Sequence, residues 1–409
     1  MVFMAKTTMN PIYLSQPEIT TNLEYMIGIR SYIMQMNKIF FGDFDSLLRE
    51  APSHEDKLWA ISRDNPYCPL SKFIGNDKAV RKLQAVAYDA LGKDNHLCRE
   101  ISFSIFGPAS SGKTTLVRLF SKTVGLPFIE FGPQIKNCEE IFKGLERVLA
   151  IEGVPLVEFR KKDYFEVPPC VVFIDEIHAV QDGVIQGLLK ATEYNDAILI
   201  TEKGKTINCK NVCWMIATTD EGMLFDAFRS RFSSLWLSYL GNKDIAKIVH
   251  LSLPEIPLDA CELIAFFNSR VPRKALEFAR YARIVKQMQS DDSWESVIKK
   301  VAIDEGIDEL GMQAIHRRVL EALANSPVAN SRMPVVVGRK KEEVSRYVMP
   351  WLLAATEESQ PYVKVTNKGY ELTEYGINQC LARKIVGSQV RKHIVNNTNN
   401  DCIVQRLVV

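Results

Sequence analysis

The sequence lacks an excess of charge of either sign, a glycine repeat and any long apolar run. Its 409 residues carry 51 Lys+Arg and 49 Asp+Glu, a formal net charge of +2, and 46% of them are hydrophobic. The near-zero charge excludes a polycation that coats nucleic acid along its whole length. The apolar content excludes a disordered or collagen-like chain. At roughly 150 residues per domain, the length predicts two to four domains that each bury a core.

Membrane and disulfide features are equally scarce. No run reaches the roughly 18 apolar residues that cross a bilayer, and the N-terminal segment has no basic stretch followed by an apolar core. We therefore expect no membrane association and a cytoplasmic location. The nine cysteines include no C-x-x-C pair, which favours buried free thiols over zinc or disulfides.

The small total charge conceals an uneven distribution. Residues 1–65 hold six Lys/Arg and eight Asp/Glu, whereas residues 311–409 hold fourteen and eight, a formal charge of +6. The basic C-terminal quarter is therefore one place to look for a polyanionic partner. A solvated basic face is the alternative.

The strongest motif follows ISFSIF, a short β-branched and aromatic run at residues 101–106. The next residues fit G-x-x-x-x-G-K-[ST], placed after a strand and opening a helix. Glycines let such a loop wrap a phosphate with its amides, while Lys113 reaches the β- and γ-phosphates and the Thr114 hydroxyl holds magnesium. The residues of this predicted ATP site are Gly107, Pro108, Ala109, Ser110, Ser111, Gly112, Lys113, Thr114 and Thr115.

Two further strands are predicted to end at the same site. PPCVVFIDEIHAV reads as a buried parallel strand that ends in two acids, so we expect Asp175 to bind Mg²⁺ and Glu176 to activate water. NVCWMIATTD ends in polar residues and is expected to lie between the two catalytic strands, where Thr219 senses the γ-phosphate. Arg229 and Arg231 follow shortly afterwards, and an arginine completing a neighbouring subunit's site accelerates other nucleotide hydrolases by about 10³ to 10⁵.

With these motifs in this order, the chain resembles the AAA+ ATPases and, within them, the RuvB family of Holliday-junction motors, over residues 69–376. The resemblance implies ATP as nucleotide and an oligomeric ring, most often a hexamer. FRSRF is similar to the arginine-finger segment, with Arg231 preferred over Arg229. SRVPRKALEFARYAR resembles the sensor-2 helix, which places Arg273 at the nucleotide phosphates. The adenine pocket is implied to involve Phe73, Ile74 and Tyr239.

The resemblance implies an α/β fold, with a parallel P-loop NTPase sheet, a helical lid and a C-terminal winged helix. The expected divisions are an N-terminal extension, the large ATPase domain, the lid, the winged helix and a tail, at residues 1–65, 66–240, 241–308, 309–380 and 381–409. A hairpin turning at residues 202–205 is also predicted from turn chemistry. RuvB has a hairpin there that grips its partner RuvA, so residues 197–209 are a candidate protein-docking site.

The C-terminal stretch departs from the RuvB pattern. RuvB carries an arginine-rich wing turn, whereas VTNKGYELT leaves two lysines, and the segment upstream retains four more cations. A helix, an apolar turn and two short strands around residues 367–369 support a winged helix independently of the resemblance. The candidate DNA contacts are Arg332, Arg339, Lys340, Lys341, Lys364 and Lys368.

Three segments have no clear counterpart in RuvB. Residues 23–40 fit an amphipathic helix, and their acidic surroundings favour partner docking or bracing of an oligomer. Residues 150–168 look like an insertion that lines the ring or forms a surface excursion. The tail either holds a short docking strand on a flexible linker or packs on its own domain.

These observations predict an ATP hydrolase, and three functions stay open. The first is a ring motor that moves on or remodels duplex or junction DNA in recombination or repair. The second is an ATP-switched, DNA-bound regulator that recruits another enzyme. The third is a protein remodeller that does not bind DNA. The basic C-terminal quarter favours the first two, because phosphate neutralisation supplies most non-specific DNA affinity.

Overall fold

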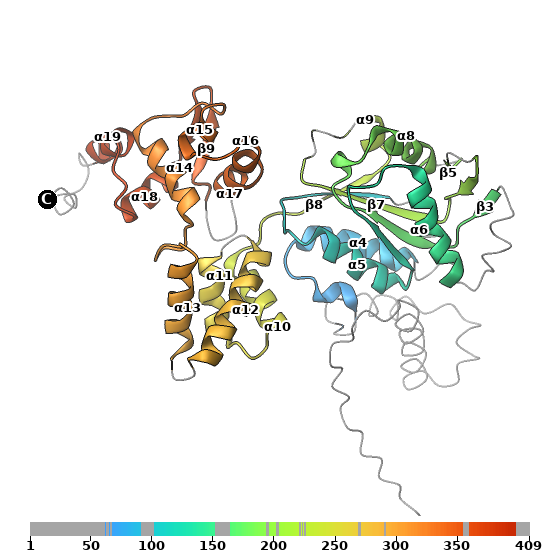
Figure 1. Ribbon diagram of the computed structural model, residues 1–409, viewed down its shortest axis with the longest axis horizontal. Helices are drawn as coiled ribbons and strands as arrows, with labels where there is room; N and C mark the ends of the chain where they lie inside the picture. The colour runs from blue at the N-terminus through green and yellow to red at the C-terminus, as the bar shows by residue number, and fades with distance from the viewer. Residues whose placement is uncertain are drawn as a thin grey trace, which may run out of the picture.

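The computed structural model describes residues 68–90, 102–151, 164–193, 196–201, 204–220, 226–268, 271–289, 292–354 and 360–397, with a few single residues beside them. The helix expected over residues 23–40 and most of the 150–168 insertion lie outside the described residues. Figure 1 shows a body built on a β-sheet, a bundle of helices and a C-terminal unit.

Five parallel strands form the central sheet in the order β2, β4, β7, β1, β8. They are β1 (Phe103–Phe106), β2 (Phe128–Phe131), β4 (Cys170–Ile174), β7 (Val212–Thr218) and β8 (Ser233–Trp236). Every residue of β1, β4 and β7 is buried, as expected of parallel strands covered on both faces. Strand β7 pairs with β1 and with β4, which confirms the predicted order and brings the ends of these three strands to one edge.

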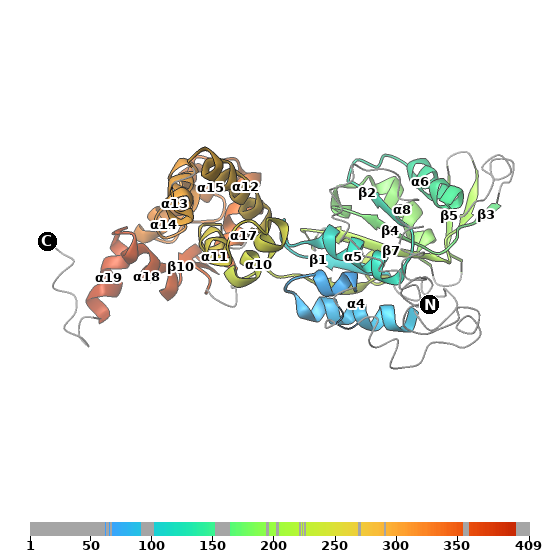
Figure 2. The same cartoon turned by 90° about the horizontal axis from the view of Figure 1, so that it is seen from below.

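Helices cover both faces of this sheet (Figures 1 and 2). Helices α4 (Asp77–Ala90) and α5 (Lys113–Val124), with the short helix η1 (Pro69–Lys72), share one core with the sheet. Helices α6 (Cys138–Ile151) and α8 (Asp182–Ala191) share the other. The α/β class predicted from the sequence is confirmed.

A second, three-stranded sheet lies beside the central one. Strands β5 (Ile198–Ile200) and β6 (Thr206–Asn208) pair antiparallel, and Cys209 N–H donates to Ala197 O at 2.7 Å, so the predicted hairpin is confirmed. Strand β3 (Tyr164–Glu166) pairs parallel with β6 and buries Phe165 in the core under α6. Residues 164–166, near the end of the 150–168 insertion, thus form a strand of this sheet.

The next unit is a bundle of helices. It contains α10 (Asn242–Ser252), α11 (Leu258–Phe267), α12 (Pro272–Met288) and α13 (Trp294–Asp304). Their apolar faces enclose one core that runs from Leu240 to Ile307. Ser293 caps α13 by accepting a hydrogen bond from Ser296 N–H at 3.1 Å, as N-terminal serines commonly do.

The C-terminal unit combines short helices with one antiparallel strand pair. Strands β9 (Val363–Thr366) and β10 (Gly369–Leu372) confirm the predicted pair, and Val328 bridges to Tyr370 beside it. Assignment of this unit to the winged helices stays a prediction. Its helical segments are α14 (Ala314–Asn325), α15 (Met333–Val337), α16 (Lys341–Glu343), η5 (Val344–Val348), α17 (Met349–Leu353), α18 (Glu374–Ala382) and α19 (Ser388–Asn397).

Helix α19 belongs to the segment whose packing the sequence left open. Val390 is fully buried, and Ile385 and Ile394 pack against the same core as α14 and α18. Up to residue 397, therefore, the tail packs on its own unit. Residues 398–409 lie outside the described part.

Two simpler expectations concern cysteines and membranes. The seven described cysteines are all buried free thiols, as predicted. Among the described helices, none combines the length and the apolar character needed to span a bilayer.

Candidate nucleotide site

The phosphate loop connects the end of β1 to the start of α5. Gly107, Ser110 and Gly112 have positive φ angles of 159°, 64° and 91°. A Cβ on Gly107 would lie 2.8 Å from the carbonyl oxygen of Leu237, and one on Gly112 would lie 3.1 Å from the Phe73 ring. The loop conformation therefore requires glycine at its two ends and brings bare backbone to the start of a helix, where anions bind.

Lys113 is the first residue of α5 and is only 6% exposed. Its Nζ donates to Gly107 O at 3.0 Å and to Pro108 O at 3.1 Å, which folds the ammonium group back over the loop. Burial lowers the pKa of Lys113, the carboxylates of Glu176 and Asp175 act in the opposite direction, and Arg273 adds to the lowering. A cation is thus held where the phosphates of a nucleotide would lie.

Asp175 follows β4 directly and faces the loop. Its Oδ2 lies 3.5 Å from the Thr114 hydroxyl, and its Oδ1 accepts a hydrogen bond from Glu176 N–H at 3.0 Å. Burial raises the pKa of Asp175, as does the neighbouring carboxylate of Glu176. A carboxylate and a hydroxyl oxygen side by side form a donor set that suits Mg²⁺.

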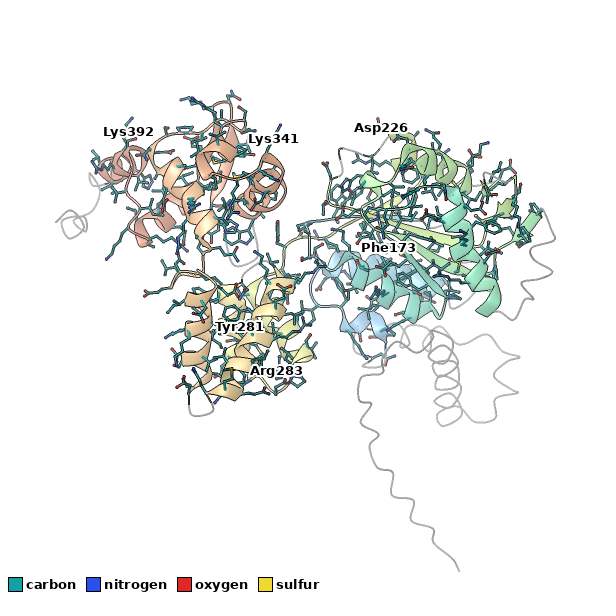
Figure 3. The ribbon with its side chains drawn as sticks, in the orientation of Figure 1. Phe173, Asp226, Tyr281, Arg283, Lys341 and Lys392 are labelled. Atoms are coloured by element: carbon teal, nitrogen blue, oxygen red, sulfur yellow. The ribbon has the colours of Figure 1, made fainter. Side chains whose placement is uncertain are left out.

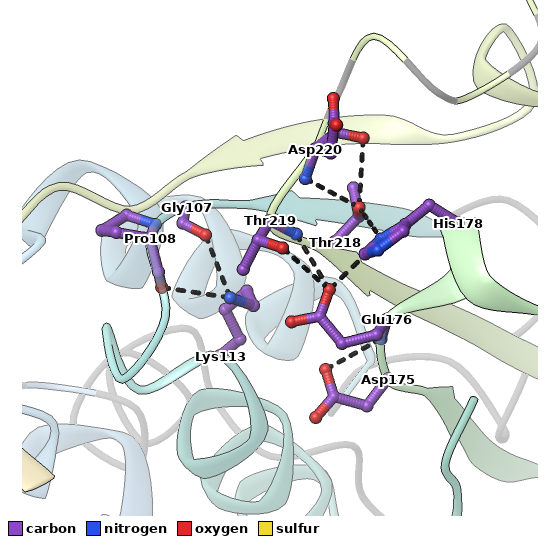
Figure 4. A network of polar contacts seen from close by, with 9 residues as sticks. All are labelled: Gly107, Pro108, Lys113, Asp175, Glu176, His178, Thr218, Thr219 and Asp220. Carbon is purple, nitrogen blue, oxygen red and sulfur yellow. Dashed lines mark hydrogen bonds and ion pairs between the residues drawn. The ribbon is translucent and has the colours of Figure 1, made fainter. Parts of the chain in front are cut away.

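Glu176 is tied to the end of β7 (Figure 4). Its Oε2 accepts hydrogen bonds from Thr219 N–H and from the Thr219 hydroxyl, both at 3.1 Å. Its backbone has a φ of 48°, the left-handed region that a residue with a side chain adopts only at a cost. The residues predicted to sense phosphate and to activate water are therefore in direct contact.

The polar cluster also contains residues that sequence reasoning missed. His178 Nδ1 lies 2.8 Å from Thr218 Oγ1 and 3.3 Å from Glu176 Oε2. The only signal was position, because His178 follows the two acids within FIDEIH and Thr218 immediately precedes Thr219. Nothing in the spacing indicated that these side chains meet.

The arginine candidates are anchored close to where they occur in the chain. Arg231 Nη1 donates to Ala227 O at 2.7 Å, and its Nη2 lies 3.6 Å from Glu193 Oε1. Arg229, at the end of α9 (Asp226–Arg229), lies over the Phe106 ring at 6.0 Å. Among the described residues, the hydrogen-bond and ion-pair partners of Arg231 do not include Lys113 or Glu176.

The remaining nucleotide-site candidates occupy varied positions. Arg273 is exposed in the first turn of α12 and lies near enough to Lys113 to influence its pKa. Phe73 is buried against Gly112, whereas Ile74 and Tyr239 are half-buried. The structure thus brings Lys113, Thr114, Asp175, Glu176 and Thr219 together.

The residues present fit a magnesium nucleotide. Ser111 Oγ is buried inside the loop and has no hydrogen-bond partner in the described protein. Buried polar groups rarely remain unpaired, so this hydroxyl indicates a site for an external acceptor such as a phosphate oxygen. Thr114 and Asp175 supply the oxygen donors for Mg²⁺.

The candidate DNA contacts belong to the C-terminal unit. Arg339 lies 3.7 Å from Glu343, and Lys364 lies 3.8 Å from Glu371, so each has an acidic neighbour. A hollow beside α15 is lined by Pro334, Val335, Gly338, Arg339, Lys340 and Glu343. In the described part of the chain, Arg332, Lys340, Lys341 and Lys368 form no ion pair.

Comparisons with known proteins agree with this site. Residues 103–238 match the model of the ATPase family associated with various cellular activities (AAA). The Holliday junction branch migration complex subunit RuvB of Parabacteroides distasonis is 25% identical over 365 residues, covering 85% of this chain and 98% of the relative. The subunit of the same name from Streptococcus pneumoniae is 25% identical over 329 residues, covering 76% and 92%.

Solved structures show the same likeness of fold. The Thermotoga maritima RuvB Holliday junction branch migration motor superposes with a TM-score of 0.59 at 21% identity, covering 76% of this chain and 96% of that one. The segment that matches the AAA family model, residues 103–238, spans β1 to β8 and contains every residue of the cluster around Lys113 and Glu176. Residues 103–238 therefore form an AAA-type ATPase domain, which identifies the chain as an ATP-hydrolysing enzyme, and over most of its length the chain is similar to the RuvB subunits.

Proposed function

We propose that this protein is a ring-forming motor that uses ATP hydrolysis to move on or remodel duplex or junction DNA. The observation that carries the proposal is the polar cluster of the ATPase domain, in a chain whose relatives are named subunits of a branch migration complex. A cytoplasmic location and a role in recombination or repair belong to the same proposal.

The nucleotide chemistry follows from the side chains in the cluster. When bound, MgATP supplies the γ-phosphoryl group that is transferred to water. Lys113 would face the phosphates, Thr114 and Asp175 would hold the metal, and Glu176 would accept a proton from the water. Thr219 fixes Glu176. Arg273, at the start of α12, is close enough to Lys113 to help lower its pKa, so we propose that the helical bundle is the lid and that its angle changes with the nucleotide.

The ring is supported by the position of the arginines. Arg231 bonds to Ala227 O and lies near Glu193, away from Lys113 and Glu176 of its own chain, which suits an arginine that completes the site of the adjacent subunit; Arg229 is the second candidate. We propose a hexamer, with Arg231 as the finger, and the β5–β6 hairpin or residues 1–65 as the contact for a protein partner. Mixing Arg231→Ala with Lys113→Ala subunits should then restore part of the ATPase activity, since each spoils a different half of the shared site. Absence of recovery in oligomers shown to be mixed would refute the arrangement.

The deciding experiment is ATP hydrolysis measured without DNA and with linear duplex, a four-way junction or single-stranded DNA. We expect duplex or junction DNA to stimulate turnover, and Glu176→Gln to bind ATP but hydrolyse it at least 100-fold more slowly. Full turnover by Glu176→Gln would remove the assigned role of this carboxylate. DNA binding without stimulation would favour the ATP-switched regulator, and no DNA binding would favour the protein remodeller.

One observation favours the ATP-switched, DNA-bound regulator. Lys364 on β9 is paired with Glu371, which leaves Lys368 as the only unpaired cation on the β9–β10 hairpin within the described residues. A weakly basic hairpin suits a protein whose DNA affinity comes less from its own contacts than from partner proteins. The motor reading needs additional cations, which Arg332, Lys340 and Lys341 supply.

The DNA contacts can be tested by charge removal with a matched control. Changing Arg339, Lys340 and Lys341 together to alanine should weaken duplex binding and reduce the slope of log K against log salt by about 2, because Glu343 already neutralises Arg339. Changing Lys286, Lys299 and Lys300 of α12 and α13 to alanine removes the same charge from the lid and should leave the slope unchanged. Equal slopes for the two triple variants would argue against the proposed DNA surface.

A further inference from the structure

His178 lies beside Glu176 and has no part in the nucleotide chemistry described so far. It lies on the short helix η3 (Ile177–Ala179), and its side chain is 9% exposed. Its ring is inserted between the tip of β7 and the side chain of Glu176 (Figure 4). An imidazole in such a place is a hydrogen-bonding group with two neighbours, so its tautomer decides what it does.

The hydrogen bonds around Thr218 determine that tautomer. The Thr218 hydroxyl has one hydrogen, which it donates to Asp220 O at 3.1 Å, while it accepts from Asp220 N–H at 3.0 Å. With the Thr218 hydrogen directed at Asp220 O, His178 Nδ1, at 2.8 Å from the same oxygen, is assigned as the donor of their contact. The carboxylate oxygen Glu176 Oε2 lies 3.3 Å from Nδ1, and a lone pair on Nδ1 would repel it. Both neighbours thus require an Nδ1–H group.

As a result, three donors converge on one oxygen of Glu176. Thr219 N–H, the Thr219 hydroxyl and His178 Nδ1–H all face Oε2. No donor among the described residues is bonded to Oε1, which points toward Lys113 in Figure 4. Hydrogen bonds therefore hold Glu176 Oε2, and Oε1 faces the phosphate loop. A side chain on the strained left-handed backbone of Glu176 needs such anchoring to keep one orientation.

We propose that His178 is a positioning residue for ATP hydrolysis. Its Nδ1–H and Thr219 together hold Glu176 Oε2, so that Oε1 is free to take the proton of the attacking water. The water oxygen bonds to the γ-phosphorus as the bond to ADP breaks, and His178 keeps its hydrogen throughout. Because Thr218 accepts from the same Nδ1–H, the tip of β7 and Glu176 are fixed together. The inference rests on the proposed role of Glu176.

Three variants of His178 separate a positioning role from packing. His178→Asn keeps an N–H donor close to the Nδ1 position, His178→Gln places its amide nearer the Nε2 position, and His178→Leu fills the space without a donor. We expect kcat to fall about 10- to 100-fold in the Leu and Gln variants, as when a hydrogen bond to a charged group is lost, with KM for ATP changed less than about threefold. The Asn variant should remain within about fivefold of the wild type.

His250 provides the matched control. Its Nδ1 faces the carbonyl of Ile256 at 2.9 Å in the lid, far along the chain from the phosphate loop, so His250→Leu should leave kcat unchanged. If His178→Leu fails to fold, Thr218→Val tests the same contact, since it removes the other partner of Nδ1–H with little change in volume. Folding of every variant is checked by its thermal unfolding and by ATP binding.

Two outcomes would overturn the inference: wild-type kcat in His178→Leu, or equal losses in the Leu and Asn variants. Both are distinguishable from failure of the proposed function. An active Glu176→Gln variant would refute the role of Glu176 itself. An inactive Glu176→Gln variant beside a fully active His178→Leu variant would refute only the positioning role of His178.

Discussion

Asp308 connects the end of the helical bundle to the C-terminal unit, and its replacement by alanine tests how firmly the two are joined. Its Oδ2 accepts from Arg383 Nε at 3.0 Å and lies 3.4 Å from Arg317 Nη1. Its Oδ1 accepts from the backbone N–H groups of Leu310 at 3.1 Å and of Met312 at 2.8 Å. One carboxylate thus bonds to two arginines of the C-terminal unit and to the turn that precedes α14.

The expected loss follows from burial. The side chains of Arg383 and Asp308 are 4% and 17% exposed, so Asp308→Ala leaves a nearly buried guanidinium without its counter-charge. Breaking buried pairs in this way costs about 3 to 5 kcal/mol. We expect about 3 kcal/mol, at the low end, because Gln379 and the carbonyl of Leu310 still accept from Arg383. Asp308→Asn should cost about 1 to 2 kcal/mol, since its amide oxygen keeps the backbone bonds.

Native-state hydrogen exchange is the appropriate assay, because it reports on each unit of a multidomain chain separately. A loss of about 3 kcal/mol corresponds to roughly 100-fold faster exchange of the amides in α14 and α18. Amides of β7 should be unaffected. Asp304→Ala, at the exposed end of α13, is the control and should exchange like the wild type. Exchange of α14 and α18 in Asp308→Ala within about fivefold of the wild type would refute the reasoning.

Two further predictions concern the nucleotide site. Burial raises the pKa of Asp175 in the folded protein, so its charge costs stability at neutral pH. Asp175→Asn should therefore stabilise the nucleotide-free protein at pH 7, by less than about 1 kcal/mol because solvent screens a half-buried carboxylate, while abolishing magnesium-dependent hydrolysis. In thermal unfolding, that gain should shrink as the pH falls below the raised pKa and vanish below the ordinary one; a gain that grows at acid pH would contradict the assignment. Gly112→Ala should lower the free energy of unfolding by about 1 to 2 kcal/mol, because the backbone at this position has a φ of 91°. Its new Cβ should displace Phe73 and weaken ATP binding at least tenfold in titrations. Gly183→Ala, which has open space around its Cβ, is the control and should not weaken ATP binding.

Local chemistry explains which parts of the site were predictable from sequence. The phosphate loop needs glycine where a Cβ would meet Leu237 or Phe73, and lysine where α5 begins. These requirements all fall within eight consecutive residues, so the motif can be recognised in the sequence. The strands before Asp175 and Thr219 are buried on both faces and therefore read as continuous apolar runs. The place of β7 between β1 and β4 was expected from the layout of nucleoside-triphosphatase sheets, and the apolar runs alone do not give it.

Contacts between distant residues were not predictable in the same way. His178 meets Thr218 across 40 positions, and Arg383 meets Asp308 across 75. In the sequence, Arg383 is one cation of a basic tail, with nothing to distinguish it from an exposed residue. Strand β3 lies in a stretch that reads as an insertion, yet its pairing with β6 depends on chain folding between them. Periodicity and motif spacing report on one segment at a time, so these partners emerge only in the folded chain.

The distribution of cations also links DNA binding to assembly. Of the six predicted DNA contacts, Arg339 and Lys364 have acidic neighbours, which leaves four without an ion pair among the described residues. Four phosphate contacts give a salt slope of about −4, which corresponds to weak binding by one subunit at physiological salt. The proposed ring would hold several such surfaces against one duplex, and each additional contact would act at the effective concentration set by the ring. Tight DNA binding is therefore expected only of the oligomer, and Arg231→Ala, if it weakens assembly, should weaken DNA binding without altering any cation of the C-terminal unit.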